Sequence, residues 1–347
     1  MSCKLSICIP TYNRADYISS TLQRILEQNR SDVQVVVSDN ASDDETQTIV
    51  ERYISQGLLI KYFRWTENMG ADVNYRKAAE LADGEYIWFL GSDDWISPGA
   101  LNVVIQKCQL LHSDIYLCSE HLCDLEMRSY SIHYLLGRNT ADTSFVFPSR
   151  DELIRYFNLA QSHSALFGYL SSIIVRKDRW SSVTYDHKYD DTLYSHMYIL
   201  YKILFQGATL HYISAPLVMW RSGNDSFGGK GKITERYLID IDGFKMIIDD
   251  FFKTDPEVNE AFIGAFRRHH PYKNIAYLRM HTKSKSAWKD ICMKLSVNYE
   301  YNKKLLNYLS YPFMPELLKV LFIFYRIQSK IYRYLLRTKV KHVSQSN

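Results

Sequence analysis

Four short segments rich in hydroxyl, amide and carboxylate side chains follow apolar runs in the first hundred residues. They are residues 10–14 (Pro-Thr-Tyr-Asn-Arg), 38–44 (Ser-Asp-Asn-Ala-Ser-Asp-Asp), 67–70 (Glu-Asn-Met-Gly) and 91–94 (Gly-Ser-Asp-Asp). Solvated turns often contain such residues, but four in succession indicate one polar site. The two adjacent carboxylates of the last segment suit a hard divalent ion, because Mg²⁺ takes one or two carboxylates and completes its shell with water and phosphate oxygens.

The apolar runs before these segments have the length and composition of buried strands. We expect strands at residues 4–10, 33–37, 58–64 and 85–90, alternating with helices at residues 14–28, 42–56, 70–82 and 98–111. This alternation predicts an α/β fold with a mostly parallel sheet and helices on both faces. Ligands of such sheets bind beyond the carboxyl ends of the strands, which is where the four polar segments lie.

The second hundred residues continue the α/β pattern less regularly. We expect strands at residues 113–119 and 171–176, a strand pair at 210–220 interrupted by Pro216, helices at 151–158 and 192–205, and loops with short strands at 124–148. Beyond residue 234 the pattern is helical throughout. We therefore predict an α/β domain at residues 1–232, divided near residue 112, and a helical C-terminal region at 233–347.

Several other classes of protein are excluded or disfavoured. The sequence has neither G-x-G-x-x-G after the first strand nor a P-loop motif, which disfavours a dinucleotide Rossmann site. The six cysteines have no zinc-site spacing, and we find no apolar segment with the length of a signal peptide or a membrane span. These features predict a cytoplasmic protein with reduced thiols.

The charge of the chain is concentrated at its C-terminus. Residues 316–347 contain seven Lys or Arg and one acid, whereas the rest of the chain is close to neutral. A local basic segment favours a local anionic partner over a nucleic-acid-binding surface, and we expect no nucleic-acid partner. Apolar residues alternate with the basic ones over residues 315–343, a pattern typical of an amphipathic helix in a membrane interface. A helix packed on the rest of the protein is the alternative.

An ordered set of motifs carries a family resemblance. Residues 9–14 (Ile-Pro-Thr-Tyr-Asn-Arg), 38–44, 68–70 and 84–94 resemble the GT-A-fold glycosyltransferases of family 2. Residues 169–177, 211–218 and 221–227 resemble a narrower group, the bacterial abequosyltransferases of O-antigen assembly. The resemblance extends to about residue 235. It implies transfer of a sugar from a nucleotide-diphosphate donor, with Mg²⁺ or Mn²⁺ as the cofactor.

The resemblance also implies roles for individual residues. The base of the nucleotide is expected at Asp39, with Asp43 or Asp44 nearby, and the metal at Asp93 and Asp94. The full set expected to bind the nucleotide sugar is Pro10, Tyr12, Arg14, Asp39, Asn40, Asn68, Ser92, Asp93 and Arg221. The family's D-x-D motif falls at residues 91–93, where Gly91 replaces the first acid. This departure affects the expected ribose contact more than the metal.

The resemblance further implies a general base before the helix at residues 192–205. The matching segment contains Asp190, Asp191 and His196, of which we favour Asp191. Such a base contributes a rate factor of ~10²–10⁴. Helix N-capping is the alternative role for either aspartate. Arg221 follows a strand and can pair with a phosphate, in a glycine-containing segment that could close over the nucleotide.

The resemblance to abequosyltransferases implies a particular donor and acceptor. The donor would be a CDP-3,6-dideoxyhexose such as abequose, and the acceptor an O-antigen repeat linked to undecaprenyl diphosphate. Family membership suggests inversion, and the acceptor implies peripheral attachment to the cytoplasmic face of the inner membrane. A UDP- or dTDP-hexose donor and a non-catalytic scaffold of polysaccharide assembly are the alternatives.

Overall fold

The computed structural model describes residues 4–28, 30–224 and 233–322. The chain divides into two compact units, one of Met1–Ser226 with Asp242–His269 and one of Phe227–Ile241 with His270–Asn347. This division differs from the expected boundary near residue 232. The physical reason is aromatic packing, since Phe252 contacts the ring of Tyr201 at 5.3 Å and Phe262 contacts Phe157 at 5.1 Å between centroids.

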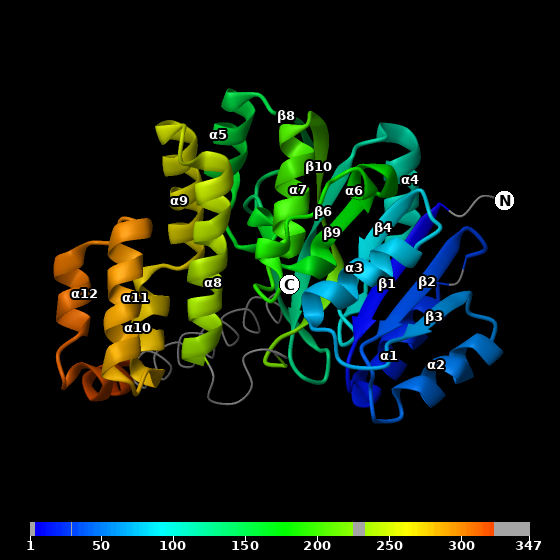
Figure 1. Cartoon of the computed structure of the whole chain (residues 1–347), viewed down its shortest axis with the longest axis horizontal. Coiled ribbons are helices and arrows are strands. Elements are labelled where there is room, and N and C mark those ends of the chain that lie inside the picture. The colour runs from blue at the N-terminus through cyan, green and yellow to red at the C-terminus, as the bar shows by residue number, and fades with distance from the viewer. Residues whose placement is uncertain (1–3, 29, 225–232, 323–347) are drawn as a thin grey trace, which may run out of the picture. The chain divides into compact units, whose positions relative to one another are not determined.

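The first half of the α/β unit has the expected alternation of strands and helices (Figure 1). The elements are β1 (Leu5–Thr11), α1 (Ala15–Leu26), β2 (Val33–Asp39), α2 (Thr46–Ser55), β3 (Ile60–Arg64), α3 (Ala71–Leu81), β4 (Tyr86–Phe89), β5 (Trp95–Ile96) and α4 (Ala100–Leu111). The strands β1, β2, β3 and β4 are parallel to one another. The predicted α/β class is confirmed.

Both faces of this sheet are covered, because alternate strand residues point to opposite sides. Ile7 and Val35 pack in one buried cluster with Leu22 of α1 and Val104 of α4. On the other face, the Cys8 thiol lies 3.3 Å from the carbonyl oxygen of Ala78 in α3. Burial on two faces explains why these strands are apolar runs rather than alternating patterns.

The second half extends the same sheet with mixed strand directions. Its elements are β6 (Ile115–Cys123), β7 (Ser129–His133), β8 (Thr143–Phe147), α5 (Arg150–Leu159), β9 (Ile173–Arg176), α6 (Lys177–Ser181), α7 (Ser195–Phe205) and β10 (Ala208–Arg221). The order is β3-β2-β1-β4-β9-β6-β10-β5. The antiparallel β9 separates the first half of the sheet from the second.

The predicted strand pair at 210–220 is one strand, β10, because Pro216 only shifts its register against β6. Proline lacks the N–H that a regular ladder needs, and the strand accommodates it with local irregularities rather than a turn. The region 124–148 contains the two short strands β7 and β8 joined by loops, as expected.

Every described element after residue 233 is helical, as expected. Helix α8 (Ile233–Ile247), a π-helical turn (Ile248–Phe252) and α9 (Pro256–His269) precede α10 (Tyr272–His281), α11 (Lys285–Asn298) and α12 (Lys303–Leu309). Residues 314–322 are also helical, and the rest of the basic segment, 323–343, lies outside the described residues. Among the helices that the structure describes, none combines the length and hydropathy needed to cross a bilayer.

Candidate active site

The acid turn, residues 91–94, lies at the carboxyl end of β4 and is fastened to α1. The Thr21 hydroxyl contacts the carbonyl oxygens of Ser92 and Asp94 at 3.0 and 2.9 Å, and all three residues are buried. These hydrogen bonds from Thr21 fix the position of the turn in the core, and Ser92 takes part through its backbone carbonyl.

Asp94 is buried and surrounded by hydrogen-bond donors. Its Oδ2 accepts from the Tyr169 hydroxyl at 2.6 Å and from the Ser171 hydroxyl at 2.7 Å, and its Oδ1 accepts from the backbone N–H of Arg221 at 3.1 Å. Burial, together with the negative charge of Asp93, raises the pKa of Asp94 to about 7. These donors hold the carboxyl in place, and their hydrogen bonds only partly offset the rise in pKa that burial causes.

Asp93 is more accessible than Asp94 and has fewer partners. Its Oδ2 accepts from the Asn224 amide at 2.6 Å. Burial raises the pKa of Asp93, although the positive charge of Arg14 and the Asn224 hydrogen bond act in the opposite direction. Of the two acids, Asp93 is the better placed to bind an added cation.

Gly91 is explained by the position of the Asp94 carboxylate. A Cβ at residue 91 would lie 2.7 Å from Asp94 Oδ2 and 3.3 Å from Asp93 Oδ1. A side chain at the first position of the D-x-D motif and the Asp94 carboxylate therefore compete for the same space. In this chain Asp94 occupies the space that an acid at residue 91 would need.

Arg221 lies against the acid turn, but its side chain is engaged there. Its Nε donates to the Asp93 carbonyl oxygen at 2.9 Å, and its Nη1 donates to the Leu125 carbonyl. Its guanidinium lies 5.2 Å from the centroid of the Tyr17 ring. Arg221 thus stabilises the acid turn. Its contact with a phosphate remains a prediction. The glycine-containing segment after Asn224 lies outside the described residues.

Asp39, at the end of β2, is fully buried and satisfied by neighbouring hydroxyls. Its Oδ1 accepts from the backbone N–H and the hydroxyl of Ser42 at 2.9 and 2.5 Å, and its Oδ2 accepts from the Tyr62 hydroxyl at 2.7 Å. The structure therefore shows Asp39 shaping the loop after β2. Direct contact with a base remains a prediction.

The loops after β2 and β3 are joined by two asparagines. The Asn40 amide nitrogen donates to Asn68 Oδ1 at 2.8 Å and to the Gly70 carbonyl oxygen at 3.2 Å, and Asn40 Oδ1 accepts from the Met69 N–H at 2.8 Å. Asn40 is buried and Asn68 is exposed. Asn40 therefore supports the loop, while Asn68 can face a ligand.

The loop after β1 packs against the loop after β2. The Asn13 N–H donates to the Ser42 hydroxyl at 2.9 Å, and Asn13 Oδ1 accepts from the Asp43 N–H at 2.9 Å. Pro10 and Arg14 are partly buried and Tyr12 is exposed. Asp44 Oδ2 accepts from the Ala15 N–H at 2.8 Å, so this acid joins the two loops rather than facing a ligand.

Asp190 and Asp191 have different surroundings although they are adjacent. Asp190 accepts from Arg76 Nη2 at 3.0 Å, the Tyr185 hydroxyl at 2.8 Å and His187 Nδ1 at 2.8 Å. Burial would raise the pKa of Asp190, but the hydrogen bonds from His187 and Tyr185 and the charge of Arg76 together lower it. An engaged carboxylate with a lowered pKa is a weak general base.

Asp191 is exposed, and no described residue forms a hydrogen bond or ion pair with its carboxylate. Its backbone is in the left-handed region, with φ 59°, as is that of Leu193, with φ 65°. A Cβ at Gly70 would lie 3.2 Å from Asp191 Oδ1, so the carboxylate approaches the loop that Asn40 and Asn68 hold. The structure thus brings Asp191 next to the expected nucleotide loops.

Asp72 of α3 holds the unusual turn at Asp191 in position. Its Oδ2 accepts from the Leu193 N–H at 2.9 Å, and its Oδ1 accepts from the Ser195 hydroxyl at 2.7 Å and the Tyr75 hydroxyl at 3.0 Å. Asp72 and Ser195 are buried. A left-handed non-glycine residue costs about 1–3 kcal/mol and persists only where surrounding contacts enforce it.

His196 lies in the core and not beside Asp191 on an open surface. Its Nε2 is 2.8 Å from the Phe167 carbonyl oxygen, and its ring meets that of Tyr75 edge-on at 5.7 Å. His196 is buried, whereas Asp191 is exposed. His196 is therefore less accessible to an acceptor hydroxyl than Asp191.

The donor set at the acid turn fits a divalent ion that shares its shell with a substrate. Within residues 4–28, 30–224 and 233–322, no cluster of three or more His, Cys, Asp or Glu has the arrangement of a complete metal site. Mg²⁺ sites commonly use one or two carboxylates with substrate phosphates and water. Asp93 and Asp94 supply that smaller set, and burial raises the pKa of both acids.

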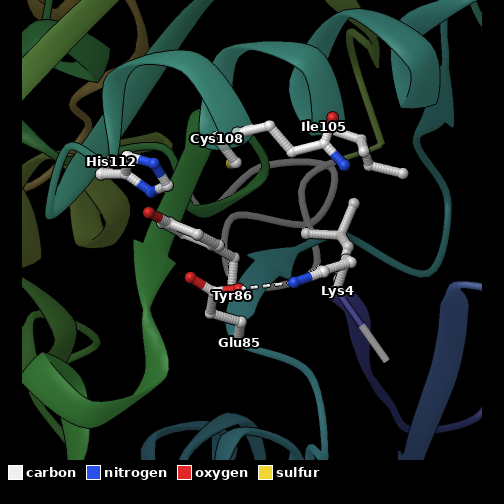
Figure 2. A pocket seen from close by; sticks show the side chains of 8 residues that line it. Lys4, Glu85, Tyr86, Ile105, Cys108 and His112 are labelled. Atoms are coloured by element: carbon white, nitrogen blue, oxygen red, sulfur yellow. Dashed lines mark hydrogen bonds and ion pairs between the residues drawn. The ribbon is translucent and has the colours of Figure 1, made fainter. Parts of the chain in front are cut away.

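A separate pocket lies at the opposite ends of the strands. Figure 2 shows it between Lys4, Tyr86, the α4 residues Ile105 and Cys108, and His112, which follows α4. The ion pair of Lys4 and Glu85, 3.4 Å long, lies at this pocket. Because β1 and β4 begin here, the pocket is remote in the fold from the acid turn and does not belong to the candidate site.

Sequence reasoning missed the residues that hold the site together. Asp72 lies within a helical pattern, and Tyr169 and Ser171 precede a strand. Asn74 donates to the carbonyl oxygens of Thr11 and Ser38 and so joins the ends of β1 and β2. A polar residue on the buried face of a predicted helix was the available signal for Asp72 and Asn74. Their partners are distant in sequence and could not be inferred.

A mostly parallel sheet with an Asp-Asp turn at the end of β4 and a free aspartate facing the neighbouring loops defines a GT-A type of glycosyltransferase. The family described as Glycosyl transferase family 2 matches residues 6–174. The abequosyltransferase RfbV of Salmonella typhimurium is 36% identical over 275 residues, which cover 77% of this chain and 81% of that protein. The chain belongs to glycosyl transferase family 2.

Solved structures share the fold at lower identity. S. aureus TarS 1-349 in complex with UDP-GlcNAc has a TM-score of 0.56 and 16% identity, and the match covers 90% of both chains. The mannosyltransferase PcManGT from Pyrobaculum calidifontis, in complex with GDP-Man and Mn²⁺, has a TM-score of 0.52 and 15% identity over 91% of this chain and 87% of that one. At such identities the likeness supports the GT-A fold alone.

Proposed function

We propose that this protein transfers a sugar from a nucleotide-diphosphate donor to a lipid-linked saccharide in bacterial surface-polysaccharide synthesis. The donor we favour is a CDP-3,6-dideoxyhexose such as abequose, and the acceptor is an O-antigen repeat on undecaprenyl diphosphate. The observation that carries the proposal is the similarity to an abequosyltransferase over about four fifths of both chains. The acid turn and Asp191 support catalysis rather than a scaffolding role.

The nucleotide would bind over the carboxyl ends of β1, β2 and β4. The loops joined by Asn13, Asn40 and Asn68 form its surroundings, and Arg14 supplies positive charge near Asp93. Asp93 and Asp94 would hold Mg²⁺ or Mn²⁺. A divalent ion there supplies charge neutralisation for the departing nucleoside diphosphate.

Asp191 is the proposed general base. An acceptor hydroxyl oxygen attacks the anomeric carbon, the bond from that carbon to the diphosphate oxygen breaks, and the hydroxyl proton passes to the Asp191 carboxylate. Its exposure and lack of described partners leave it available for this step, whereas Asp190 is held by Arg76. One displacement of this kind inverts the anomeric configuration.

The protein would act at the cytoplasmic face of the inner membrane, attached peripherally. The described beginning of the basic segment supports this, because Leu317, Val320 and Leu321 are exposed on one short helix. Exposed apolar side chains next to basic ones suit the interface of an anionic bilayer.

A panel of donors and acceptors tests the function. Purified protein is incubated with CDP-abequose, UDP-GlcNAc or a dTDP-hexose, with Mg²⁺ or Mn²⁺, and with undecaprenyl-diphosphate-linked saccharides. We expect transfer from the CDP-sugar. Transfer from a UDP- or dTDP-sugar instead would replace the donor but keep the enzyme class. Absence of both transfer and nucleotide binding would favour a scaffold.

A further inference from the structure

A row of partly exposed aromatic rings leads away from the acid turn. Its members, which we call the aromatic row, are Tyr169, Trp220, His163 and His269. Tyr169 and Trp220 have ring centroids 4.9 Å apart and planes inclined by 33°. His163 follows at 6.1 Å from Trp220, and His269 at 4.4 Å from His163. The Tyr169 hydroxyl donates to Asp94, so the row begins one side chain from the acid turn.

The row lies on the side of the sheet away from the expected nucleotide loops. In the order of strands, β2 and β1 lie on one side of β4, and β9, β6 and β10 lie on the other. Tyr169 precedes β9, and Trp220 is the second-to-last residue of β10. A ligand on these rings would therefore approach the acid turn from the side opposite to the nucleotide.

The local structure makes room for this arrangement. A Cβ at residue 168 would lie 2.7 Å from His163 Cδ2, so Gly168 allows the imidazole to lie directly over the backbone. Burial lowers the pKa of His269 to about 3, with a smaller contribution from His133, so this ring is neutral at pH 7. The end of the row at His269 is thus uncharged.

Two polar groups beside the row have unused hydrogen-bonding capacity among the described residues. The indole N–H of Trp220 donates to no described residue, whereas those of Trp65, Trp88 and Trp95 each donate to one. Glu120 is fully buried; its Oε1 contacts His133 and Ser164, and its Oε2 is buried without a partner. Rings that combine an apolar face with polar edges suit a ligand that has both apolar and polar surface.

We propose that the aromatic row binds the acceptor saccharide, with the sugar ring stacked on Trp220 and its hydroxyls bonded to the polar edges of the row. Sugars present C–H faces for stacking and hydroxyls for hydrogen bonds, which matches a surface of Tyr, Trp and His rings. This inference rests on the proposed function, because it names where the substrate that receives the sugar lies.

The experiment measures binding of simple glycosides by saturation-transfer NMR. Methyl α-mannoside, α-galactoside and α-rhamnoside are added at millimolar concentration to protein saturated with CDP and Mn²⁺. Loss of one stacking partner lowers affinity about tenfold. We therefore expect Trp220→Ala and His163→Ala to lose about tenfold in glycoside affinity, Trp220→Phe to retain most of it, and CDP affinity to stay constant in all three.

Two controls make the result decisive. Tyr130, 63% exposed on β7, is outside the row, and Tyr130→Ala should bind glycosides as the wild type does. Lys202 lines a groove with Tyr185, His187 and Tyr198, so a loss confined to Lys202→Ala would move the acceptor there and overturn the inference. Unchanged glycoside binding in Trp220→Ala, no glycoside binding by the wild type, or an equal loss of CDP affinity would also overturn it.

Failure of the inference and failure of the proposed function give different results. A wild-type protein that transfers sugar but whose Trp220→Ala variant has an unchanged acceptor KM contradicts the inference alone. A wild-type protein that binds glycosides through Trp220 but turns over no nucleotide sugar contradicts the proposed function.

Discussion

The acid turn, residues 91–94, and the turn at Asp190–Leu193 both contain two adjacent aspartates, but the fold treats them in opposite ways. In the acid turn, the second aspartate is buried under Tyr169 and Ser171, and the first is the more accessible. In the later turn, Asp190 is engaged by Arg76, and Asp191 is exposed on a left-handed backbone.

In each pair, one aspartate serves the structure and leaves the other available for chemistry. Asp94 and Asp190 accept three hydrogen bonds each from the protein. Asp93 accepts one from a side chain, and Asp191 accepts none among the described residues. The pairs also differ in burial, and this difference suits the two proposed roles. A cation is held best by a rigid, partly buried carboxylate, whereas a proton acceptor must meet a second substrate from solvent.

The largest effect is expected for Asp93→Asn. The amide removes the accessible negative charge from the acid turn, and the lost Lewis-acid contribution is on the order of several kcal/mol, so metal-dependent turnover should fall below detection. Calorimetric titration with Mn²⁺ and CDP should show loss of metal-dependent binding, while the melting temperature stays close to that of the wild type. Near-normal turnover with Mg²⁺ or Mn²⁺ would exclude Asp93 as the metal ligand.

Asp191→Asn should reduce kcat by ~10²–10⁴ and leave the affinity for the donor unchanged, because a general base acts in the transition state. Asp190→Asn is the matched control. It removes charge from the Arg76 contact and should lower stability more than it lowers kcat. If Asp190→Asn has the large loss of kcat and Asp191→Asn does not, the roles within this turn are reversed.

The strands, the helices between them and the polar strand ends were predictable from residue patterns. Apolar runs such as residues 33–37 and helical spacing at 14–28 are local signals that the whole fold agrees with. The sequence also indicated the acid turn and the Asp190–Asp191 segment as candidate site regions, and these roles remain predictions. It did not predict which aspartate of each pair is engaged, because Tyr169, Ser171 and Arg76 lie far from them in sequence.

The domain boundary and the role of Arg221 also depend on contacts between residues distant in sequence, which the sequence alone does not predict. Part of α8, the π-helical turn and all of α9 belong to the α/β unit. Phe252 of the turn packs on Tyr201 and Phe262 of α9 packs on Phe157, contacts that periodicity alone does not reveal. Arg221 has the residue type of a phosphate ligand, but its Nε bonds to the Asp93 carbonyl oxygen. Residue type indicated the location of this arginine and not its partner.

Gly91→Asp should reduce activity less than Asp93→Asn or Asp191→Asn. It restores the family's first acid, yet its Cβ would lie 2.7 Å from Asp94 Oδ2 and would displace that carboxylate. Overpacking typically costs about 1–3 kcal/mol. We expect reduced thermal stability and weaker Mn²⁺ binding in Gly91→Asp, and recovery of both in the double variant with Asp94→Ser. A fully active single variant would show that the two acids do not compete for space.

The smallest effect on chemistry is expected for removal of the basic C-terminal segment, which lies in the other unit. Truncation after Pro312 should leave CDP binding unchanged and should release the protein from vesicles of anionic lipid in a co-sedimentation assay. Each Lys or Arg near an anionic surface contributes about 1 kcal/mol, so the attachment of wild-type protein should weaken steeply with salt.

A full-length variant separates charge from chain length in this last test. Replacing the Lys and Arg residues of the segment by Gln keeps the apolar side chains, including Leu317, Val320 and Leu321, which are exposed. We expect this variant to bind anionic vesicles weakly and to bind CDP normally, because attachment needs both apolar insertion and charge. If truncated protein still co-sediments with anionic vesicles at low salt, the anchor lies elsewhere, and the segment is more simply a helix with a solvated basic face.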